Sequence, residues 1–460
     1  MVTSYVDTAR QARGADLERP LYLRLAERLS AAVAEEGLAG LPSARALAEE
    51  SGLNRATVTA AYRELARRGL LVLRRGRPSR QGPPRPAAAE SFAEQPENSL
   101  DLARYVPDQA LLPAQNVLRW LGLGEAEGEA VAQYGDPWGY GGLREWLRAR
   151  LAGWGLRGRL LLTSGVQHGL DLLLRAMVRP GDTVLIEDPT YPGLPPLLAI
   201  HQVNMVGLPV HADGIHSEDL EALLARARPR LAVLTPTLHN PSGTVASLAS
   251  RQAVLTRLQE NRVTVVEELF DPGLLTGGVA PPPLAALDPG VIAVGSFSKV
   301  LFPGLRVGWL SGPEELVDRI AAVKRATDLS GSPFLEATAW SLCRQGMLDA
   351  QVARLRAAAL ERAAVVVGEL AGAPGGVRWS QPQGGFSLMV LLPAGWSARA
   401  VAARAARRGV WVLPGPAMSA SGRDDVVRLA FAAAGGERLR QGVGIFVAAL
   451  RAPARELPLV

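Results

Sequence analysis

Cysteine and lysine are both scarce in this sequence, and each shortage excludes a kind of chemistry. Cys343 is the only cysteine among 460 residues, so the chain has no internal disulfide bond and no cysteine-based zinc or iron–sulfur cluster. We expect no bound metal. Only two of the 50 basic residues are lysines, Lys299 and Lys324. In a chain that otherwise uses arginine, a lysine indicates amine chemistry that a guanidinium cannot perform.

Long apolar runs are missing as well. The first 20 residues are polar and lack the apolar segment of a signal peptide, and no later stretch reaches the roughly 18 apolar residues of a membrane span. We therefore expect a cytoplasmic protein that does not contact a membrane. With 48% hydrophobic and 20% charged residues, the composition is typical of globular domains, and the length predicts roughly two or three of them.

Positive charge is concentrated near the N-terminus. Residues 1–80 hold 14 arginines, no lysine and nine acidic residues, a balance of +5 out of the net +6 of the whole chain. Localised positive charge favours a polyanion such as nucleic acid as a partner, although a solvated basic surface has the same composition.

The spacing of apolar residues in this region predicts a helix-turn-helix. Apolar residues at every fourth position indicate a helix over residues 20–37. Ser43 can cap a second helix, Ala44–Glu50, and Asn54 can cap a third, because both side chains accept hydrogen bonds from the amides at a helix start. The buried stripe of the third helix is expected to be Val58, Ala61, Tyr62 and Leu65.

The third helix is the expected recognition helix for the major groove of DNA. The run from Leu70 to Leu73, followed by a basic turn, predicts a strand and a wing. An ordinary three-helix domain with an exposed basic face is the alternative. The residues expected to contact DNA are Ser43, Arg45, Arg55, Thr57, Thr59, Arg63, Arg74, Arg75 and Arg77.

A proline-rich stretch divides the chain. Residues 79–98 are rich in proline and small residues and show no apolar periodicity, which is typical of a linker. The predicted domains are therefore a DNA-binding domain over residues 1–78 and a larger domain over residues 99–460.

Four short apolar runs in the larger domain predict buried strands of a mainly parallel sheet. The runs are Thr183–Ile186, Leu231–Leu234, Val263–Val266 and Val291–Val294. Because ligands bind at the carboxyl ends of such strands, the residues that follow the runs are expected to carry the chemistry. These are Glu187, Asp188, Thr235–Asn240, Glu267, Glu268 and Ser296–Lys299.

Lys299 follows the last of these runs. A partly desolvated amine has a lowered pKa and can form a Schiff base with a carbonyl compound. Ser296–Lys299 also matches the S-x-x-K pattern of penicillin-binding proteins and β-lactamases. That interpretation requires a later K-T-G, and the only other lysine, Lys324, is followed by Arg325 and Ala326. A surface lysine without a chemical role is the remaining alternative.

The residues around Lys299 suit an aldehyde cofactor that carries a phosphate and a pyridine ring. Residues 163–167 precede a helical pattern and offer backbone amides to a phosphate, with Ser296 and Arg306 as further donors. Tyr191 can stack on the ring, and Asn240 can donate a hydrogen bond to a phenolic oxygen.

Several motifs occur in a fixed order along the larger domain. They are Tyr134–Gly139 with Leu143–Glu145, Thr163–Gln167, Glu187–Tyr191, Asn240–Gly243, Ser296–Arg306 and Arg428–Phe431. Together they resemble the pyridoxal 5′-phosphate enzymes of the class I aminotransferase fold, over about residues 99–460. The resemblance implies that Lys299 forms the Schiff base, that Arg428 binds the α-carboxylate of an amino acid, and that Tyr134 reaches the phosphate of the partner subunit. The residues assigned to the cofactor are Lys299, Asn240, Glu268, Tyr191, Ser164, Gly165, Val166, Ser296, Ser298, Arg306 and Tyr134.

Motifs of the first domain resemble the GntR-type winged helix. They are Pro20–Tyr22, Leu41–Arg45, Arg55–Val58 and Arg67–Leu70. Fused to the second domain, they identify the chain as a member of the MocR (GabR-like) subfamily of bacterial transcriptional regulators. The resemblance implies a winged helix-turn-helix (α+β) joined to an α/β fold-type I domain with a smaller C-terminal α+β subdomain. It also implies double-stranded operator DNA, an amino acid or amine effector, and a head-to-tail homodimer.

Some features separate the chain from that subfamily. Glu268 stands where the subfamily has an aspartate for the pyridine nitrogen, and Phe270 stands where it has a tyrosine for the phenolic oxygen. Asn240 is then the only expected hydrogen-bond donor to the phenolic oxygen, which predicts at most weak half-transamination. The segment before Leu41 is a few residues short, and proline-rich sequence after Gly76 replaces the second wing strand.

The main hypothesis is a transcriptional regulator that senses pyridoxal 5′-phosphate, an amino acid or an amine through aldimine formation at Lys299. A metabolic aminotransferase with an N-terminal extension is one alternative. A cofactor-free scaffold in which Lys299 is a relic is another, and the presence of Asn240, Ser296 and Arg306 argues against it.

Overall fold

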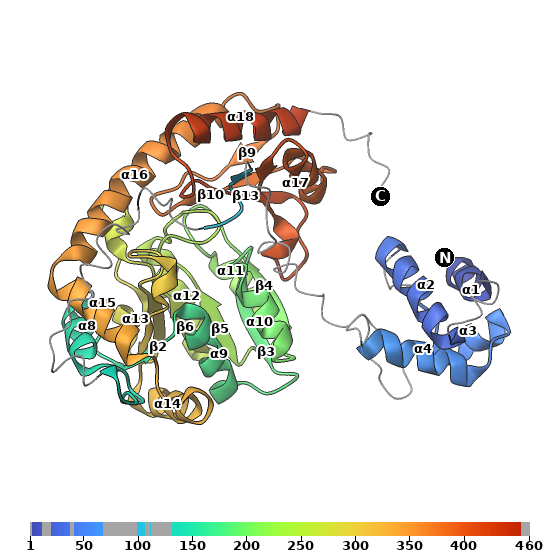
Figure 1. The fold of residues 1–460 in the computed structure, drawn as a ribbon, viewed down its shortest axis with the longest axis horizontal. Coiled ribbons are helices and arrows are strands. Elements are labelled where there is room, and N and C mark those ends of the chain that lie inside the picture. The colour runs from blue at the N-terminus through green and yellow to red at the C-terminus, as the bar shows by residue number, and fades with distance from the viewer. Residues whose placement is uncertain are drawn as a thin grey trace. The chain divides into compact units, whose positions relative to one another are not determined.

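The computed structural model describes residues 2–11, 20–36, 41–67, 99–105, 111 and 131–451. The chain forms two compact units that divide between residues 87 and 88. Figure 1 shows the helices of the first unit in blue and the larger second unit in the remaining colours. No helix among the described residues is long and apolar enough to cross a membrane. The predicted linker over residues 79–98 lies outside the described residues, so the domain boundaries stay a prediction.

The described part of the first unit is helical. It contains α1 (Val2–Gln11), α2 (Leu21–Glu36), α3 (Ala44–Ser51) and α4 (Arg55–Arg67). The three helices expected from the sequence are confirmed, and the predicted stripe of α4 is fully buried in the core of this unit. The predicted strand and wing after Gly69, with Arg74, Arg75 and Arg77, lie outside the described residues.

Helices α3 and α4 begin at the predicted caps. Ser43 Oγ accepts a hydrogen bond from the Ala46 amide at 3.2 Å, and Asn54 Oδ1 accepts one from the Ala56 amide at 2.8 Å. Gly52 ends α3 with φ 68°, a left-handed conformation that favours glycine. The turn between α3 and α4 is therefore only three residues long, from Gly52 to Asn54.

The sequence reasoning missed helix α1. Tyr5, Val6 and Ala9 of α1 are buried in the same core as α2, α3 and α4. Three apolar residues form too short a stripe to be recognised in a polar segment. Packing against the other helices stabilises this helix, because an isolated helix of this length is marginal in water.

A seven-stranded sheet forms the centre of the second unit in the described part of the chain. Its order is β2-β8-β7-β6-β5-β3-β4. The strands are β2 (Arg159–Thr163), β3 (Thr183–Asp188), β4 (Asn204–Pro209), β5 (Leu231–Leu234), β6 (Thr264–Glu268), β7 (Ile292–Ser296) and β8 (Gly308–Gly312). The neighbours from β4 to β7 pair in parallel, and β8 is antiparallel to both β7 and β2. The four predicted runs are therefore confirmed as strands of a mainly parallel sheet.

Helices cover both faces of this sheet (Figure 1). One face packs against α9 (Val166–Met177), α10 (Leu194–Ile200) and α14 (Glu314–Asp328). The other packs against α11 (Ser217–Leu224), α12 (Leu248–Glu260) and α13 (Leu284–Leu287). In β3, Val184 and Ile186 face the first layer and Leu185 faces the second, so a continuous apolar run is required.

A smaller subdomain follows the sheet. Its four-stranded antiparallel sheet has the order β12-β13-β10-β9 among the described residues. The strands are β9 (Arg378–Trp379), β10 (Ser387–Leu391), β12 (Leu413–Pro414) and β13 (Val426–Ala430). Helices α16 (Met347–Leu370), α17 (Ala398–Ala406) and α18 (Gly436–Arg451) pack with it. This confirms the predicted C-terminal α+β subdomain.

The remaining elements connect these layers. They are α8 (Gly141–Gly153), α15 (Pro333–Arg344) and the short 3-10 helices Pro272–Leu274, Pro303–Leu305 and Gly415–Ala417. Strand β1 (Leu100–Asp101) pairs in parallel with β11 (Val410–Trp411), so residues near the start of the second unit join its C-terminal subdomain.

Candidate functional site

A cavity of about 510 Å³ lies at the carboxyl ends of the parallel strands, beside the small subdomain. The structure brings most of the predicted site residues to its wall. These are Val166, Tyr191, Asn240, Glu268, Ser296, Ser298, Lys299, Arg306 and Arg428. Val166 stands at the start of α9, and Tyr191, Asn240, Glu268, Ser296, Ser298 and Lys299 stand at the end of a strand of the large sheet or in the loop that follows it, as the sequence predicted. Arg306 stands two residues before β8.

One end of the cavity is suited to an anion. Arg306 Nη2 donates to the Ser164 carbonyl at 2.8 Å, and Nη1 lies 3.5 Å from Ser298 Oγ. Gly165 precedes α9 with φ 87°, and a Cβ on it would lie 2.9 Å from Arg306 Nη2. The glycine therefore leaves room for the guanidinium beside the amides of a helix N-terminus, and both groups attract phosphate.

Ser164 and Gly165 stand behind this wall rather than in it. They are absent from the residues that line the cavity, and the Ser164 amide donates to His168 Nδ1 at 3.0 Å. Val166 and Gln167, at the start of α9, do line the cavity. Cofactor contact by Ser164 and Gly165 stays a prediction.

Lys299 follows β7, and its amine faces the cavity. Nζ donates to the backbone carbonyl of Tyr105 at 2.5 Å. Burial and the positive charges of Arg428 and Arg306 together lower the pKa of Lys299 to about 8, although the Glu268 carboxylate opposes them. An amine with this pKa is partly neutral near neutral pH and can attack a carbonyl carbon.

Glu268 is the last residue of β6 and is 7% exposed. Burial raises the pKa of its carboxyl to about 7, although the nearby Lys299 lowers it. Phe270, two residues later, is buried, and its ring meets the Tyr105 ring edge-on with centroids 6.1 Å apart. The structure therefore places an acid but no hydroxyl from this strand beside Lys299.

Arg428 lies on β13 opposite the large sheet. Its Nη1 donates to Asn240 Oδ1 at 3.0 Å and its Nη2 to the Ala103 carbonyl, while its Nε is buried without a hydrogen-bond partner among the described residues. Burial lowers the pKa of Arg428 to about 10. Because Asn240 accepts through Oδ1, its NH₂ group is the part that can donate to a ligand.

Tyr191 is held in a fixed position. Its hydroxyl donates to Gln167 Oε1 at 3.2 Å, and Gln167 Nε2 donates to the Gly193 carbonyl at 3.1 Å. A Cβ at position 193 would lie 2.5 Å from the tyrosine ring, so the glycine makes room for it. This ring can form one flat wall of the cavity.

The structure leaves Tyr134 outside this cavity. Its side chain is 88% exposed, so it makes no contribution to the site of its own chain. The sequence reasoning also missed the contacts that Ala103 and Tyr105 make with the site. Tyr105 accepts a hydrogen bond from the Phe386 amide at 3.0 Å, and burial raises its pKa to about 12. No motif or periodicity marks these two residues.

The predicted DNA-contacting residues of α4 lie on its outer face. Arg55 and Arg63 are exposed, and Thr57 and Thr59 are half-buried beside the buried stripe. Ser43 caps α3, and Arg45 pairs with Glu49 at 2.8 Å on the surface.

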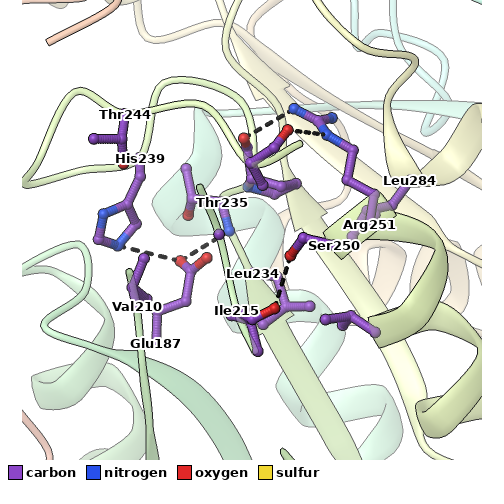
Figure 2. Close-up of a pocket in the computed structure, with 14 residues that line it drawn as sticks. Glu187, Val210, Ile215, Leu234, Thr235, His239, Thr244, Ser250, Arg251 and Leu284 are labelled. Atoms are coloured by element: carbon purple, nitrogen blue, oxygen red, sulfur yellow. Dashed lines mark hydrogen bonds and ion pairs between the residues drawn. The ribbon is translucent and has the colours of Figure 1, made fainter. Parts of the chain in front are cut away.

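A second, smaller cavity lies among buried polar residues on one face of the sheet (Figure 2). Glu187 Oε2 accepts a hydrogen bond from the Thr235 amide at 2.9 Å, and His239 Nε2 is 3.6 Å away. Arg251 donates to the carbonyls of Ala246, Pro282 and Pro236. The cavity has a volume of about 20 Å³, which is room for a single water molecule. The polar groups around it therefore support the sheet and do not bind a ligand.

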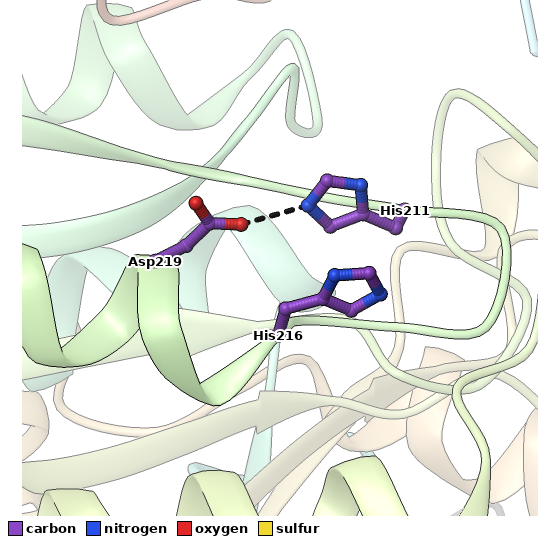
Figure 3. A group of neighbouring side chains, drawn as sticks. All are labelled: His211, His216 and Asp219. Atoms are coloured by element: carbon purple, nitrogen blue, oxygen red, sulfur yellow. Dashed lines mark hydrogen bonds and ion pairs between the residues drawn. The ribbon is translucent and has the colours of Figure 1, made fainter.

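Three further polar side chains gather near the edge strand β4 (Figure 3). His211 Nε2 pairs with Asp219 at 2.7 Å, and His216 Nε2 pairs with Asp213 at 3.0 Å. The two rings stack 3.8 Å apart at 13°. A metal ion lies close to the plane of each imidazole that binds it, so two nearly parallel rings do not share one ion in this arrangement.

Comparison with known proteins agrees with these two units. The family of aminotransferases class I and II matches residues 97–444, and the gntR family of bacterial regulatory proteins matches residues 18–80. The 2-aminoadipate transaminase of Thermus thermophilus is 31% identical over 69% of this chain and 81% of its own length. The probable rhizopine catabolism regulatory protein MocR of Rhizobium meliloti is 28% identical over 76% of this chain and 77% of its own length.

A solved structure shows the same fold. The α-aminoadipate aminotransferase LysN of Thermus thermophilus, complexed with N-(5′-phosphopyridoxyl)-L-leucine, superposes with a TM-score of 0.73. It is 28% identical, and the match covers 79% of this chain and 96% of LysN. The chain thus belongs to the aminotransferase class I and II family and has a GntR-family domain fused to it, and its relatives include regulators of the MocR group.

Proposed function

We propose that this protein is a DNA-binding transcriptional regulator that holds pyridoxal 5′-phosphate on Lys299 and responds to an amino acid or amine. One observation carries the proposal. One cavity is lined by a lysine with a lowered pKa, a buried carboxyl, an arginine beside the N-terminus of α9, and a second arginine whose Nε has no hydrogen-bond partner among the described residues. The same chain has a GntR-family domain.

The residues present fit this cofactor. The Arg306 guanidinium, which lies beside Gly165 at the N-terminus of α9, suits the phosphate, and the Lys299 amine suits the aldehyde. Glu268 would face the pyridine nitrogen, and the NH₂ group of Asn240 would donate to the phenolic oxygen. When bound, the cofactor supplies an aldehyde that reacts with primary amines and a ring that withdraws electrons from them.

Arg428 points to a carboxylate on the effector. Its buried Nε has no hydrogen-bond partner among the described residues, and a carboxylate would satisfy it with a charge-assisted hydrogen bond. A ligand with both a primary amine and a carboxylate, an amino acid, therefore matches Lys299 and Arg428 together. An amine without a carboxylate would match Lys299 only.

Regulation is favoured over rapid turnover by the groups beside Lys299. Burial raises the pKa of Glu268 to about 7, and its side chain is one methylene longer than the aspartate that the subfamily has at this position, which alters the pairing with a pyridine nitrogen. Phe270 offers no hydroxyl to the phenolic oxygen. Both features leave amine capture intact and weaken the later proton transfers of transamination.

A homodimer is the expected assembly. Tyr134 belongs to a motif of the aminotransferase fold, yet it is 88% exposed and lies outside the cavity of its own chain. Contact with the phosphate in a second copy would account for both observations. The head-to-tail arrangement of that dimer rests on the resemblance alone.

A metabolic aminotransferase is the second candidate. The identity with 2-aminoadipate transaminase over 81% of that enzyme favours it. Steady turnover with an amino acid and a keto acid, near the median enzyme rate of about 10 per second, would support it over regulation.

The double variant Glu268→Asp with Phe270→Tyr separates the two functions. We expect faster half-transamination, because the acid and the hydroxyl are restored, while operator binding by the unliganded protein stays nearly unchanged. Single-turnover absorbance spectra and a DNA-binding titration measure the two effects. No gain in the half-reaction would show that these two residues do not limit the chemistry.

A further inference from the structure

Arg104 is a basic residue in the wall of the cavity that contains Lys299 and Arg428. In the chain it stands between two residues that reach the site through their backbone carbonyls. The Ala103 carbonyl accepts a hydrogen bond from Arg428, and the Tyr105 carbonyl accepts one from Lys299 Nζ at 2.5 Å. Arg104 is therefore placed between the arginine expected to bind a carboxylate and the reactive amine.

Asp101 holds Arg104 in position. Its Oδ1 accepts hydrogen bonds from the Ala103 and Arg104 amides, both at 2.9 Å, and its Oδ2 lies 3.1 Å from Arg104 Nε. The Arg104 side chain is 42% exposed, so a ligand in the cavity can reach it. A guanidinium has five N–H donors in a rigid fork and can bind Asp101 and a second carboxylate together.

The cavity wall carries more positive than negative charge. Among the described residues, its basic side chains are Arg104, Lys299, Arg306 and Arg428, and its acidic side chains are Glu268 and Asp271. Asp271 is paired at 2.8 Å with Arg150, a residue outside the wall, so it offsets little of this positive charge. The wall as a whole therefore favours a ligand with several anionic groups.

The proposed function uses three of the four basic side chains. Arg306 suits the cofactor phosphate, Lys299 suits the aldehyde, and Arg428 suits the α-carboxylate of an amino acid. The side chain of an amino acid begins at the carbon that carries both its amine and its α-carboxylate. It therefore begins in the region between Lys299 and Arg428, beside the segment that contains Arg104.

We propose that Arg104 binds a second carboxylate on the effector, so that the protein responds to an acidic amino acid such as aspartate or glutamate. The inference rests on the proposed function and names the class of its ligand. A carboxylate would form a charge-assisted hydrogen bond with the guanidinium. A basic side chain would be repelled by it.

An apolar effector is the competing interpretation, because Leu269, Val300 and Leu413 also line the cavity. An apolar side chain packed against Arg104 would remove water from a charged group without replacing its hydrogen bonds, and this costs free energy. The charge of the wall therefore favours the acidic ligand.

Pairs of amino acids with the same size and different charge test the proposal. The full-length protein, loaded with pyridoxal 5′-phosphate, is titrated with L-aspartate against L-asparagine and with L-glutamate against L-glutamine. The change in near-visible absorbance gives each dissociation constant. We expect at least one acid to bind about 10- to 100-fold more tightly than its amide, the scale of a hydrogen bond to a charged group. Equal affinities within both pairs, or tighter binding of L-leucine than of either acid, would overturn the proposal.

Two matched variants assign the effect to Arg104. In Arg104→Gln, the ratio between acid and amide should fall to within about twofold, while the affinity for the amide changes little. A merely structural role would weaken acid and amide equally and keep the ratio, which would contradict the proposal. Arg423→Gln is the control, because Arg423 also pairs with a nearby aspartate, Asp425, but is absent from the cavity wall. It should keep the wild-type ratio.

Operator affinity separates failure of this proposal from failure of the proposed function. In the wild type, the acid should change operator affinity at a concentration about 10- to 100-fold lower than the amide does. A response to acid and amide at equal concentrations would contradict the role of Arg104 and leave the regulator intact. A protein that gains no near-visible absorbance with the cofactor, or whose operator affinity responds to no amino acid or amine, would contradict the proposed function itself.

Discussion

The regions around Lys299 and Lys324 contain the only two lysines of the chain, and they differ in one instructive way. Both side chains are buried or nearly so, and each donates to a backbone carbonyl, Lys299 to Tyr105 and Lys324 to Pro137 at 2.8 Å. Burial lowers the pKa of both. At Lys324 the carboxylates of Glu336, Asp328 and Asp136 oppose this lowering. At Lys299 two arginines add to it and one carboxylate, that of Glu268, opposes it.

The difference teaches that neighbouring charges, and not burial alone, make a lysine reactive. At Lys324 the carboxylates favour the ammonium form, which serves as a structural donor between α14 and the loop before α8. At Lys299 the arginines favour the neutral amine beside a cavity of about 510 Å³. One lysine stabilises the fold, and the other is available to a ligand.

The largest expected contrast is in cofactor attachment. Lys299→Ala should abolish the near-visible absorbance and the borohydride-fixable adduct completely, because the reactive amine is removed. Lys324→Arg, which keeps a donor for Pro137, should retain both. Mass spectrometry of peptides after borohydride reduction identifies the modified lysine. An adduct on Lys324 would show that Lys324, and not Lys299, is the reactive lysine.

The next contrast is in folding stability. Lys324→Met should lower the free energy of unfolding by about 1 to 3 kcal/mol, because it leaves the Pro137 carbonyl without its donor and removes a positive charge near the buried Glu336 carboxyl. Lys299→Met also leaves a carbonyl, that of Tyr105, without its donor, but it should lower the free energy of unfolding by less, since it removes a buried cation that two arginines already disfavour. Denaturant unfolding measures both, and equal losses would mean that Lys299 is a structural lysine too.

A smaller effect is expected in the first unit, far in sequence from both lysines. Arg55→Ala on α4 should weaken specific operator binding by about 1 to 3 kcal/mol if it contacts a base. If it contacts a phosphate instead, the log-log dependence of affinity on salt should become shallower by about 1. The cofactor absorbance should not change in either case. A variant with unaltered affinity and salt dependence would remove Arg55 from the DNA-binding surface.

The smallest expected effect is a shift in pH dependence. Cofactor attachment requires the neutral amine, so its rate should rise with pH through the Lys299 pKa of about 8. The Glu268 charge raises that pKa, so Glu268→Gln should move the midpoint to lower pH. Glu336→Gln, beside Lys324, is the matched control and should leave the midpoint in place. Stopped-flow absorbance across pH 6 to 10 follows the rate.

Much of the fold and part of the site could be predicted from the sequence, because the signals were local. Apolar runs such as Leu231–Leu234 must be strands when both faces of the sheet are covered, and the polar residues after them must meet at one edge. The caps at Ser43 and Asn54 are likewise set by neighbours within four residues.

The rest depended on contacts between residues far apart in sequence. The Tyr105 carbonyl and Lys299 are 194 positions apart, and the Ala103 carbonyl and Arg428 are 325 apart. Backbone carbonyls have no residue type, so no motif indicates that they will accept these bonds. Helix α1 was missed for a related reason, because it is stabilised by the core that it joins.

The most direct test of the account is operator affinity measured with and without pyridoxal 5′-phosphate, for the wild type and for Lys299→Ala. The operator can be selected from random duplex DNA by the full-length protein. We predict an affinity change of about 5- to 150-fold in the wild type and no change in Lys299→Ala. Equal affinities with and without cofactor in the wild type, despite a full near-visible band, would contradict a regulator that works through Lys299.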